Sequence, residues 1–194
     1  MDAASQLFVR EGFENVSMRR IAERIQYSPA AIYRYFKNKR EILSVLRSEA
    51  FARFNSFQEQ AEREMDSREA DPVERLRAGG RSYVRFAMEH TEDYRIMFDL
   101  GPGDVDLEGP WAEEPIKAFG RLEDAVSRCM ELGWWPGREV REVSVVLWSA
   151  THGLVSLVLS GRLLNFVEQD ELTRLHEVMG QMLLPEFGQE VRKG

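Results

Sequence analysis

The chain has a single cysteine among its 194 residues, Cys129, and little that marks an exported protein. One cysteine excludes an internal disulfide and a cysteine-rich metal cluster, so a reducing, intracellular setting is expected. We interpret Cys129 as a small buried apolar residue. The opening residues, Met1-Asp-Ala-Ala, contain an acidic residue instead of a basic one and lead into a helical pattern. They predict no signal peptide, and the expected location is the cytoplasm.

Catalytic and metal-binding patterns are also missing. The sequence has no Gly-x-Ser-x-Gly, no phosphate loop ending in Gly-Lys-Ser/Thr, and no Gly-x-Gly-x-x-Gly after a strand. It has neither His-Glu-x-x-His nor Glu-x-x-His, the helical spacings typical of metal sites. Since catalytic triads can assemble from distant positions, these absences do not exclude catalysis. They leave no positive reason to predict an enzyme, and we expect no metal and no cofactor.

Alternating strand patterns, internal repeats and low-complexity tracts are absent as well, so the predicted fold class is all-α, with about nine helices. Residues 143–161 form a run of 19 residues without a charge, about 28 Å long as a helix, which approaches a membrane-spanning length. Eight of these 19 positions are Ser, Thr, His or Gly. That mixture favours a helix buried in a soluble protein over a membrane span.

A basic region stands out against this acidic background. Residues 17–47 contain eight Lys or Arg and two Glu, a net charge of +6, whereas residues 48–194 have a net charge of −11 and the whole chain −7. A basic patch on an acidic protein is typical of a polyanion-binding site. A solvated charged surface is the simpler alternative. The coincidence of charge with helix caps and apolar spacing favours the binding site.

Residues 17–36 predict two short helices joined by a tight turn. Ser28, followed by Pro29, is the start signal of the second helix. The apolar positions at helical spacing are Ile21, Ala22, Ile25, Ile32 and Phe36, and the outward positions of the second helix are Ala30, Ala31, Tyr33 and Arg34. The pattern is that of a helix-turn-helix, whose second helix enters the major groove of DNA.

The first 47 residues resemble the DNA-binding domain of the TetR family of transcriptional repressors. The residues that carry this resemblance are Leu7-Phe8, Gly12-Phe13, Ile21-Ala22, Tyr27-Ser28-Pro29, Ile32-Tyr33, Tyr35-Phe36, Lys39 and Ile42-Leu43. One departure concerns the turn before Ser28, where the family often has glycine and this chain has Gln26 and Tyr27. The resemblance implies a DNA-binding domain over residues 1–47 and an effector-binding and dimerisation domain over residues 48–194.

Chemistry and resemblance together assign roles within the first domain. Lys39, at the start of the fourth helix, suits a phosphate, and Ser17 and Tyr35 are similar candidates. Arg34 and Tyr33 are placed to reach base edges or phosphates, and the alanines to touch thymine methyl groups. The full predicted set is Ser17, Ser28, Ala30, Ala31, Tyr33, Arg34, Tyr35 and Lys39. The alternative for the two tyrosines is packing inside the three-helix domain.

The rest of the chain also predicts helices. They are expected over residues 3–11, 39–65 (capped by Asn38), 72–90, a short stretch around Tyr94, 113–132, about 138–161, and 171–184, where Pro185 stops the last one. Gly79-Gly80 inside a helix costs about 1 kcal/mol per glycine, so close packing or a kink is expected there. Residues 99–110, dense in Gly, Pro and Asp, predict a loop, more simply a connector than a lid.

Three segments of the second domain are similar to a TetR effector domain with a Trp-x-x-x-His-Gly signature, here Trp148, His152 and Gly153: residues 81–90, 94–98 and 147–154. The resemblance implies a dimer made largely by the last two helices and a ligand cavity among the helices before them. Our ligand-binding candidates are Tyr83, Phe86, Met97, Phe98, Trp148 and His152. Their composition favours a mainly hydrophobic ligand, although the same side chains could simply fill the core.

The histidines require separate interpretations. His152, beside a tryptophan, is either a hydrogen-bonded core residue or a ligand contact. We expect His90 and His176 to be ordinary helix-end or surface residues.

Two features of the last helices indicate an interface. Ser149, Gly153 and Ser156 (with Ser160) form a strip of small residues that lets another helix approach closely, from a partner or from the same subunit. The predicted ninth helix has a wide apolar face with Leu172, Leu175, Met179 and Met182. Such a face ordinarily packs on its own domain. The apolar face and the resemblance together predict that these residues form a dimer interface.

The sequence therefore predicts a homodimeric repressor that binds an inverted-repeat operator in double-stranded DNA and is released by a small hydrophobic effector. The ligand can act only through different affinities for the DNA-competent and DNA-incompetent conformations, and the long fourth helix is the expected link between the sites. One alternative is a regulator controlled by a protein partner. Another is a helical enzyme or carrier with a vestigial DNA-binding domain, which would retard no DNA at low salt.

Overall fold

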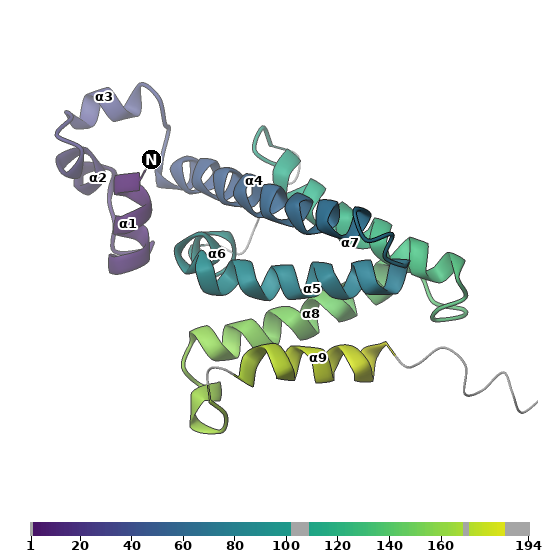
Figure 1. Ribbon diagram of the computed structural model, residues 1–194. Helices are drawn as coiled ribbons and strands as arrows, with labels where there is room; N and C mark the ends of the chain where they lie inside the picture. Colours follow the sequence, from purple (N-terminus) through teal and green to yellow (C-terminus); the bar gives the residue numbers. More distant parts are fainter. Residues whose placement is uncertain (1, 102–108, 169–170, 185–194) are drawn as a thin grey trace, which may run out of the picture. The chain divides into compact units, whose positions relative to one another are not determined.

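A computed structural model describes residues 2–101, 109–168 and 171–184. Throughout this part of the chain the regular structure is helical and no strand occurs, which confirms the all-α fold class. The elements in order are α1 (Asp2–Glu11), α2 (Met18–Arg24), α3 (Pro29–Tyr33), α4 (Lys39–Asp66), α5 (Pro72–Glu89), α6 (Thr91–Phe98), α7 (Glu113–Glu131), α8 (Val140–Leu159), the 3-10 helix η1 (Leu163–Asn165) and α9 (Leu172–Leu183) (Figure 1). Most of the predicted 99–110 loop, and the predicted stop at Pro185, lie outside the described residues.

The chain divides into two compact units. The first comprises residues 1–56 and 86–118, and the second comprises residues 57–85 and 119–194. The helices α4, α5 and α7 each contribute residues to both units. The domain boundary expected after residue 47 falls inside α4 and within the first unit.

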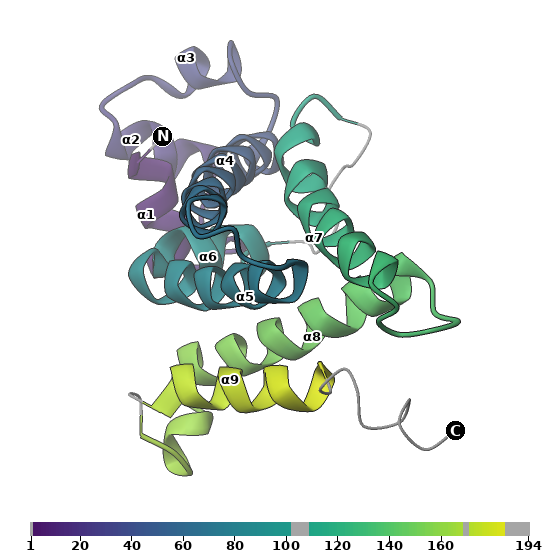
Figure 2. The same ribbon diagram turned by 45° about the vertical axis from the view of Figure 1, so that its right-hand side comes forward.

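The first unit holds α1, α2 and α3, which we call the head, together with the first part of α4 and with α6. The head helices gather around the start of α4, and α6 lies against α1 (Figure 2). The core of this part is apolar and almost fully shielded from water, with Phe8, Val16, Ile21, Ile42 and Leu43. The head thus has its own hydrophobic centre, which fixes the direction of its outer surface.

Further along α4 in the same unit, aromatic residues pack edge-on. Phe51 contacts Phe98 with a centroid distance of 5.7 Å, and Phe54 contacts Phe86 at 5.2 Å. Asn55 is fully buried, and its side-chain amide donates to the carbonyl (3.0 Å) and the carboxylate (2.7 Å) of Glu114. These contacts attach α6 and the start of α7 to α4.

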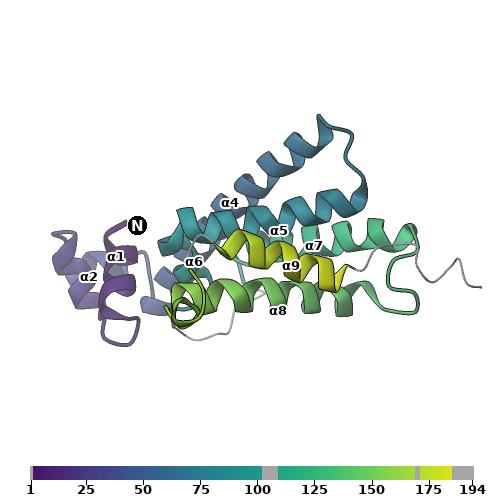
Figure 3. The ribbon, with the colours of Figure 1, turned by 60° about the horizontal axis from the view of Figure 1, so that its bottom comes forward.

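The second unit contains the rest of α4, α5 and α7 together with α8 and α9. The last two helices run side by side (Figure 3). Leu76, Val126, Cys129, Val143 and Leu184 form a buried cluster. The expected burial of Cys129 is confirmed, and burial raises the pKa of its thiol to about 11. A thiol of this kind is a packing residue, because the reactive thiolate is suppressed.

The glycine pair in α5 bears on two predictions from the sequence: the close packing or kink expected at the pair itself, and the surface or helix-end position expected for His176. A Cβ added at Gly80 would lie 2.8 Å from Cε1 of His176, so the expected close packing is confirmed at Gly80. The surface or helix-end prediction for His176 is wrong, because the missing side chain of Gly80 leaves space in which the imidazole is buried. Burial, with a smaller contribution from nearby Arg81, lowers the pKa of His176. His90 does lie at a helix end, next to the start of α6.

Candidate nucleic-acid interface and effector region

Two serines start the helices of the head, as the sequence predicts. Oγ of Ser17 accepts a hydrogen bond from the backbone N–H of Arg20 at 3.1 Å, and Oγ of Ser28 accepts one from Ala31 at 3.2 Å. Pro29 occupies the first turn of α3. These caps satisfy backbone donors that a helix start leaves unpaired. Each hydroxyl hydrogen can still be donated, so the caps are compatible with a phosphate contact.

The short helix α3 has one buried and one exposed side. Ile32 is buried, whereas Tyr33 and Tyr35 are 56% and 75% exposed. Ala30 and Arg34 are exposed too, and Ala31 is partly so. The tyrosines therefore do not pack inside the three-helix domain, which was the alternative to a DNA contact. Five of the residues predicted to contact DNA are thus at least partly exposed on α3 or directly after it, whereas Ser17 and Lys39 stand at the starts of α2 and α4.

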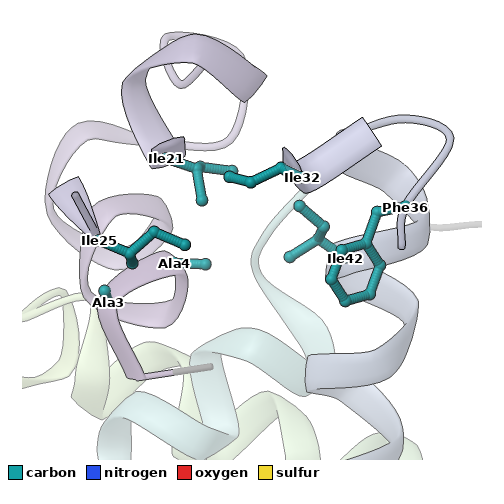
Figure 4. Close-up of a pocket in the computed structure, with 7 residues that line it drawn as sticks. All are labelled: Ala3, Ala4, Ile21, Ile25, Ile32, Phe36 and Ile42. Atoms are coloured by element: carbon teal, nitrogen blue, oxygen red, sulfur yellow. The ribbon is translucent and has the colours of Figure 1, made fainter. Parts of the chain in front are cut away.

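A small apolar pocket of about 70 Å³ lies within the head (Figure 4). Its lining comes from α1, α2, α3, the segment after α3, and α4: Ala3, Ala4, Ile21, Ile25, Ile32, Phe36 and Ile42. No polar atom lines it. A pocket with this lining has no polar group that could orient a ligand.

The positive charges of the head fall into two groups. Arg19 pairs with Glu23 at 3.1 Å and Arg20 pairs with Glu11 at 3.0 Å. Arg10 of α1 is exposed and has no ion-pair partner in the part of the chain that the structure describes, and the same holds for four cations nearer to α3 in the sequence: Arg24, Arg34, Lys37 and Arg40. These four lie at the end of α2, directly after α3 and at the start of α4, so the cations without ion-pair partners flank α3 in the sequence.

Lys39 has a different environment from the other cations. Its Nζ donates to the carbonyl oxygens of Phe13 (2.8 Å) and Glu14 (3.2 Å) and lies 4.4 Å from the centroid of the Phe13 ring. The Glu14 carboxylate is 3.7 Å away. An ammonium has only three hydrogen-bond donors, so these partners compete with the phosphate contact predicted for Lys39.

The turn between α2 and α3 contains a position where the resemblance led us to expect glycine. Gln26 has a φ of 59°, in the left-handed region that glycine occupies without strain. The turn therefore keeps the conformation that glycine favours, although its residue is glutamine.

The predicted ligand-binding residues are distributed between the two units. Phe86, Met97 and Phe98 belong to the first unit. In the second unit, Nδ1 of His152 lies 3.0 Å from the Tyr83 hydroxyl, and Nε2 lies 3.3 Å from Oγ of Ser156. Trp148 packs against both Phe119 and His152, with centroid distances of 6.0 and 5.9 Å. His152 is thus a hydrogen-bonded histidine, and the ligand cavity remains a prediction.

The predicted interface residues differ in their exposure within a single chain. Leu172 is buried in its own unit, Leu175, Met179, Gly153 and Ser156 are partly exposed, and Ser149 and Met182 are exposed. Further exposed apolar side chains lie on α8 and α9 (Val145, Val146, Leu157 and Val178), and in and directly after η1 (Leu164 and Phe166). Helix periodicity alone could have indicated Val145 and Val146, but the exposed ends around η1 depend on the tertiary structure.

Helix α8 has the length and composition of a membrane span. Only 22% of its most apolar 18-residue stretch is buried in the single chain. Over the described residues, no group of three His, Cys, Asp or Glu side chains could hold a metal ion.

Comparison with known sequences identifies two matching regions. Residues 1–46 match the profile described as bacterial regulatory proteins, tetR family, and residues 76–181 match the tetracyclin repressor-like C-terminal domain. A 62-residue stretch is 39% identical to YvkB of Bacillus subtilis (strain 168), an uncharacterized HTH-type transcriptional regulator. That match spans 32% of this chain and 33% of YvkB.

Solved structures share the fold. FadR from Bacillus subtilis, in complex with stearoyl-CoA, has a TM-score of 0.71 at 19% identity, covering 96% of this chain and 97% of FadR. PfmR of Thermus thermophilus, a TetR family transcriptional regulator, has a TM-score of 0.64 at 20% identity, covering 97% of this chain and 98% of PfmR. At these identities the structures show the fold alone, whereas the two sequence profiles cover most of the chain. The chain belongs to the TetR family of bacterial regulatory proteins.

Proposed function

We propose that this protein is a cytoplasmic, homodimeric transcriptional repressor that binds an inverted-repeat operator and is released by a small, mainly hydrophobic effector. The carrying observation is the exposure of Tyr33, Arg34 and Tyr35 on and after α3, together with three further exposed cations flanking α3 in the sequence that have no ion-pair partner among the described residues. Phosphates favour cations and hydroxyl donors, and base edges favour arginine. In this proposal α3 is the recognition helix.

A dimer is supported by the exposed apolar side chains of α8 and α9. Met182 is 78% exposed and Val146 is 55% exposed in the single chain, and Ser149 and Gly153 leave room for a close helix–helix approach. Exposed apolar surface of this extent is typical of a protein–protein interface. Two recognition helices related by a two-fold axis then require half-sites about 34–36 Å apart, one turn of DNA.

The hydrophobic effector is supported by the aromatic residues around His152. The Tyr83–His152–Ser156 hydrogen bonds supply one polar, orientable group beside Trp148 and Phe119. The FadR structure with stearoyl-CoA shows that this fold can carry a ligand with a long apolar chain. Long-chain acyl compounds, including acyl-CoA thioesters, are therefore among the first candidates to screen for this chain.

Selection of genomic DNA fragments by the purified protein, followed by gel-shift titration, tests the DNA-binding half of the proposal. We expect enrichment of a single inverted repeat and a steep loss of affinity with salt. Recovery of no fragment at low salt would contradict repression and favour an enzyme or carrier with a vestigial head. Reporter expression from the selected operator should rise when the protein is removed; a fall would make the protein an activator.

A thermal-shift screen with apolar compounds tests the effector half. A hit should raise the melting temperature and release the operator, and both effects should weaken in the His152→Ala variant. Tyr83→Phe is the matched variant, because it removes only the hydroxyl that bonds His152. If no compound does both, or if hits bind all variants equally, the pocket assignment is wrong. Release by a protein from the same cell, but by no compound, would favour the protein-partner alternative.

A further inference from the structure

Three residues on one side of α4 share a common role. Lys39, Leu43 and Arg47 are spaced four residues apart, so their side chains lie along one stripe of the helix. Lys39 binds the turn between α1 and α2, as described above. The other two contact the last turn of α6 and the residues just after that helix, Leu100 and Gly101, all within the first unit.

Arg47 binds the carbonyl end of α6. It is 6% exposed, its Nε donates to the carbonyl of Ile96 at 3.2 Å, and its Nη2 donates to the carbonyl of Leu100. The last carbonyls of a helix lack partners within the helix and carry partial negative charge, which a guanidinium satisfies. A buried arginine used in this way fixes the position of Leu100 and Gly101 on α4.

Gly101 then lies directly against the head. Its φ is +68°, and a Cβ added there would be 2.6 Å from Cδ2 of Leu43 and 3.2 Å from two ring atoms of Phe13. Leu43 and Phe13 are themselves buried, so neither has free space into which to move. Phe13 is also the residue whose ring and carbonyl bind Lys39, and its ring packs on Phe8 of α1 at 5.3 Å.

We propose that Gly101 and Arg47 are positioning residues for DNA binding. The backbone at Gly101 is the surface on which the α1–α2 turn rests through Phe13, Arg47 holds that surface on α4, and Lys39 holds the turn from its other side. The head is thereby oriented by the end of α6 as well as by α4. The DNA-binding part of this inference rests on the proposed function, whereas the mechanical part concerns the head alone.

The Gly101→Ala variant tests the contact, and Gly137→Ala is its matched control. Gly137 has a similar φ of +76° but no atom within 4 Å of an added Cβ, so both variants carry the same backbone strain and only one has a clash. Hydrogen exchange is read at the amides of Gly12, Asn15 and Val16, which bond within the α1–α2 turn. We expect exchange there to accelerate roughly tenfold or more in Gly101→Ala alone. Equal exchange in the two variants would overturn the proposal.

A second pair of variants avoids the strained position. Arg47→Met keeps an unbranched apolar chain and removes the donors to the α6 carbonyls, whereas Arg53→Met removes the exposed ion pair of α4 with Asp93 on α6. We expect faster exchange at the α1–α2 turn only for Arg47→Met. If Arg53→Met has the same effect, general loosening of α6 is responsible and the specific role of its end is wrong.

Operator binding completes the test. Gly101→Ala and Arg47→Met should bind the operator at least about tenfold more weakly than their controls while keeping the helical content of the head. Faster exchange with unchanged affinity would overturn the positioning role. If the unmodified protein binds no DNA at all, the proposed function fails, and the exchange measurements alone decide whether the contact orients the head.

Discussion

The outer side of α3 and the outer surface of α8 and α9 are both exposed, but they differ in chemistry. The residues on and around α3 present tyrosines, and cations without ion-pair partners in the described ranges, over a buried apolar core. The surface of α8 and α9 presents valine, leucine and methionine side chains and small residues. Water solvates the first surface well and the second poorly. The comparison shows that exposure alone says little, and that the chemistry of the exposed atoms indicates whether nucleic acid or protein covers them.

We expect the largest effect from a charge placed in the apolar surface of α8 and α9. Met182→Asp places a charge where we propose that a partner chain packs, and the dimer dissociation constant should rise more than about a hundredfold, because an unpaired charge would be buried. The side chain is exposed in the single chain, so the subunit itself should stay folded. Sedimentation velocity measures the change. Gln60→Asp, at an exposed position on α4, is the control and should leave assembly intact.

Arg34→Ala sharpens the comparison at the polar surface. If this side chain reads a base edge, its loss should cost about 1–3 kcal/mol on the operator and much less on scrambled DNA. Gel-shift titrations on both DNAs measure the difference. Equal losses on the two DNAs would instead make Arg34 a phosphate contact.

Two lysines near the start of α4 are expected to differ in role. Lys37, just before the helix, should bind phosphate, whereas Lys39 should mainly stabilise the fold. We expect Lys37→Ala to lower the salt slope of DNA binding by about one unit with little change in stability. Lys39→Met should instead reduce the free energy of unfolding by about 1–3 kcal/mol, because two backbone carbonyls lose a charged donor. Chemical denaturation of each variant measures the change in stability, and salt titration of DNA binding measures the change in salt slope. A reduced salt slope without loss of stability in Lys39→Met would restore its role as a phosphate ligand.

The buried His176 of α9 should make the stability of the second unit sensitive to acid. Its pKa is lowered in the folded protein, so the unfolded chain binds the proton first as the pH falls below about 6.5. Stability is therefore present above that pH and is lost as the pH falls toward the folded-state pKa. The melting temperature should fall more between about pH 7.5 and 5.5 in the wild type than in His176→Gln. Parallel curves for the two proteins would remove His176 as the cause.

The smallest effect concerns the turn that aims α3. Gln26→Gly should stabilise the protein by about 1 kcal/mol or less, because glycine adopts the left-handed conformation without strain but has more freedom in the unfolded state. A rise of a few degrees in melting temperature would be the corresponding result. Gln60→Gly is the control, since glycine inside a regular helix should be destabilising. A loss of stability in Gln26→Gly would show that the glutamine side chain makes a needed contact.

Much of the head could be predicted because its signals are local. The Ser17 and Ser28 caps act over three residues, and the proline at the start of α3 acts on its own backbone. Apolar spacing likewise placed Ile21 and Ile32 on the inner side without knowledge of what they contact. The effector region was harder to predict, because aromatic residues show the same sequence pattern whether they line a cavity or fill a core.

The sequence by itself determined the helical class, the helix-turn-helix, the burial of Cys129 and the family, since each depends on local spacing or on many residues together. Only the tertiary structure decided the contacts and the burial of individual polar residues. Lys39 meets a carbonyl 26 positions away, and His176 is buried because Gly80, on another helix, leaves it room. The need for glycine at position 101 is visible only in the fold, where Phe13 and Leu43 leave no room for a Cβ. Long-range contacts of this kind arise from chain topology, which no local pattern of residues encodes.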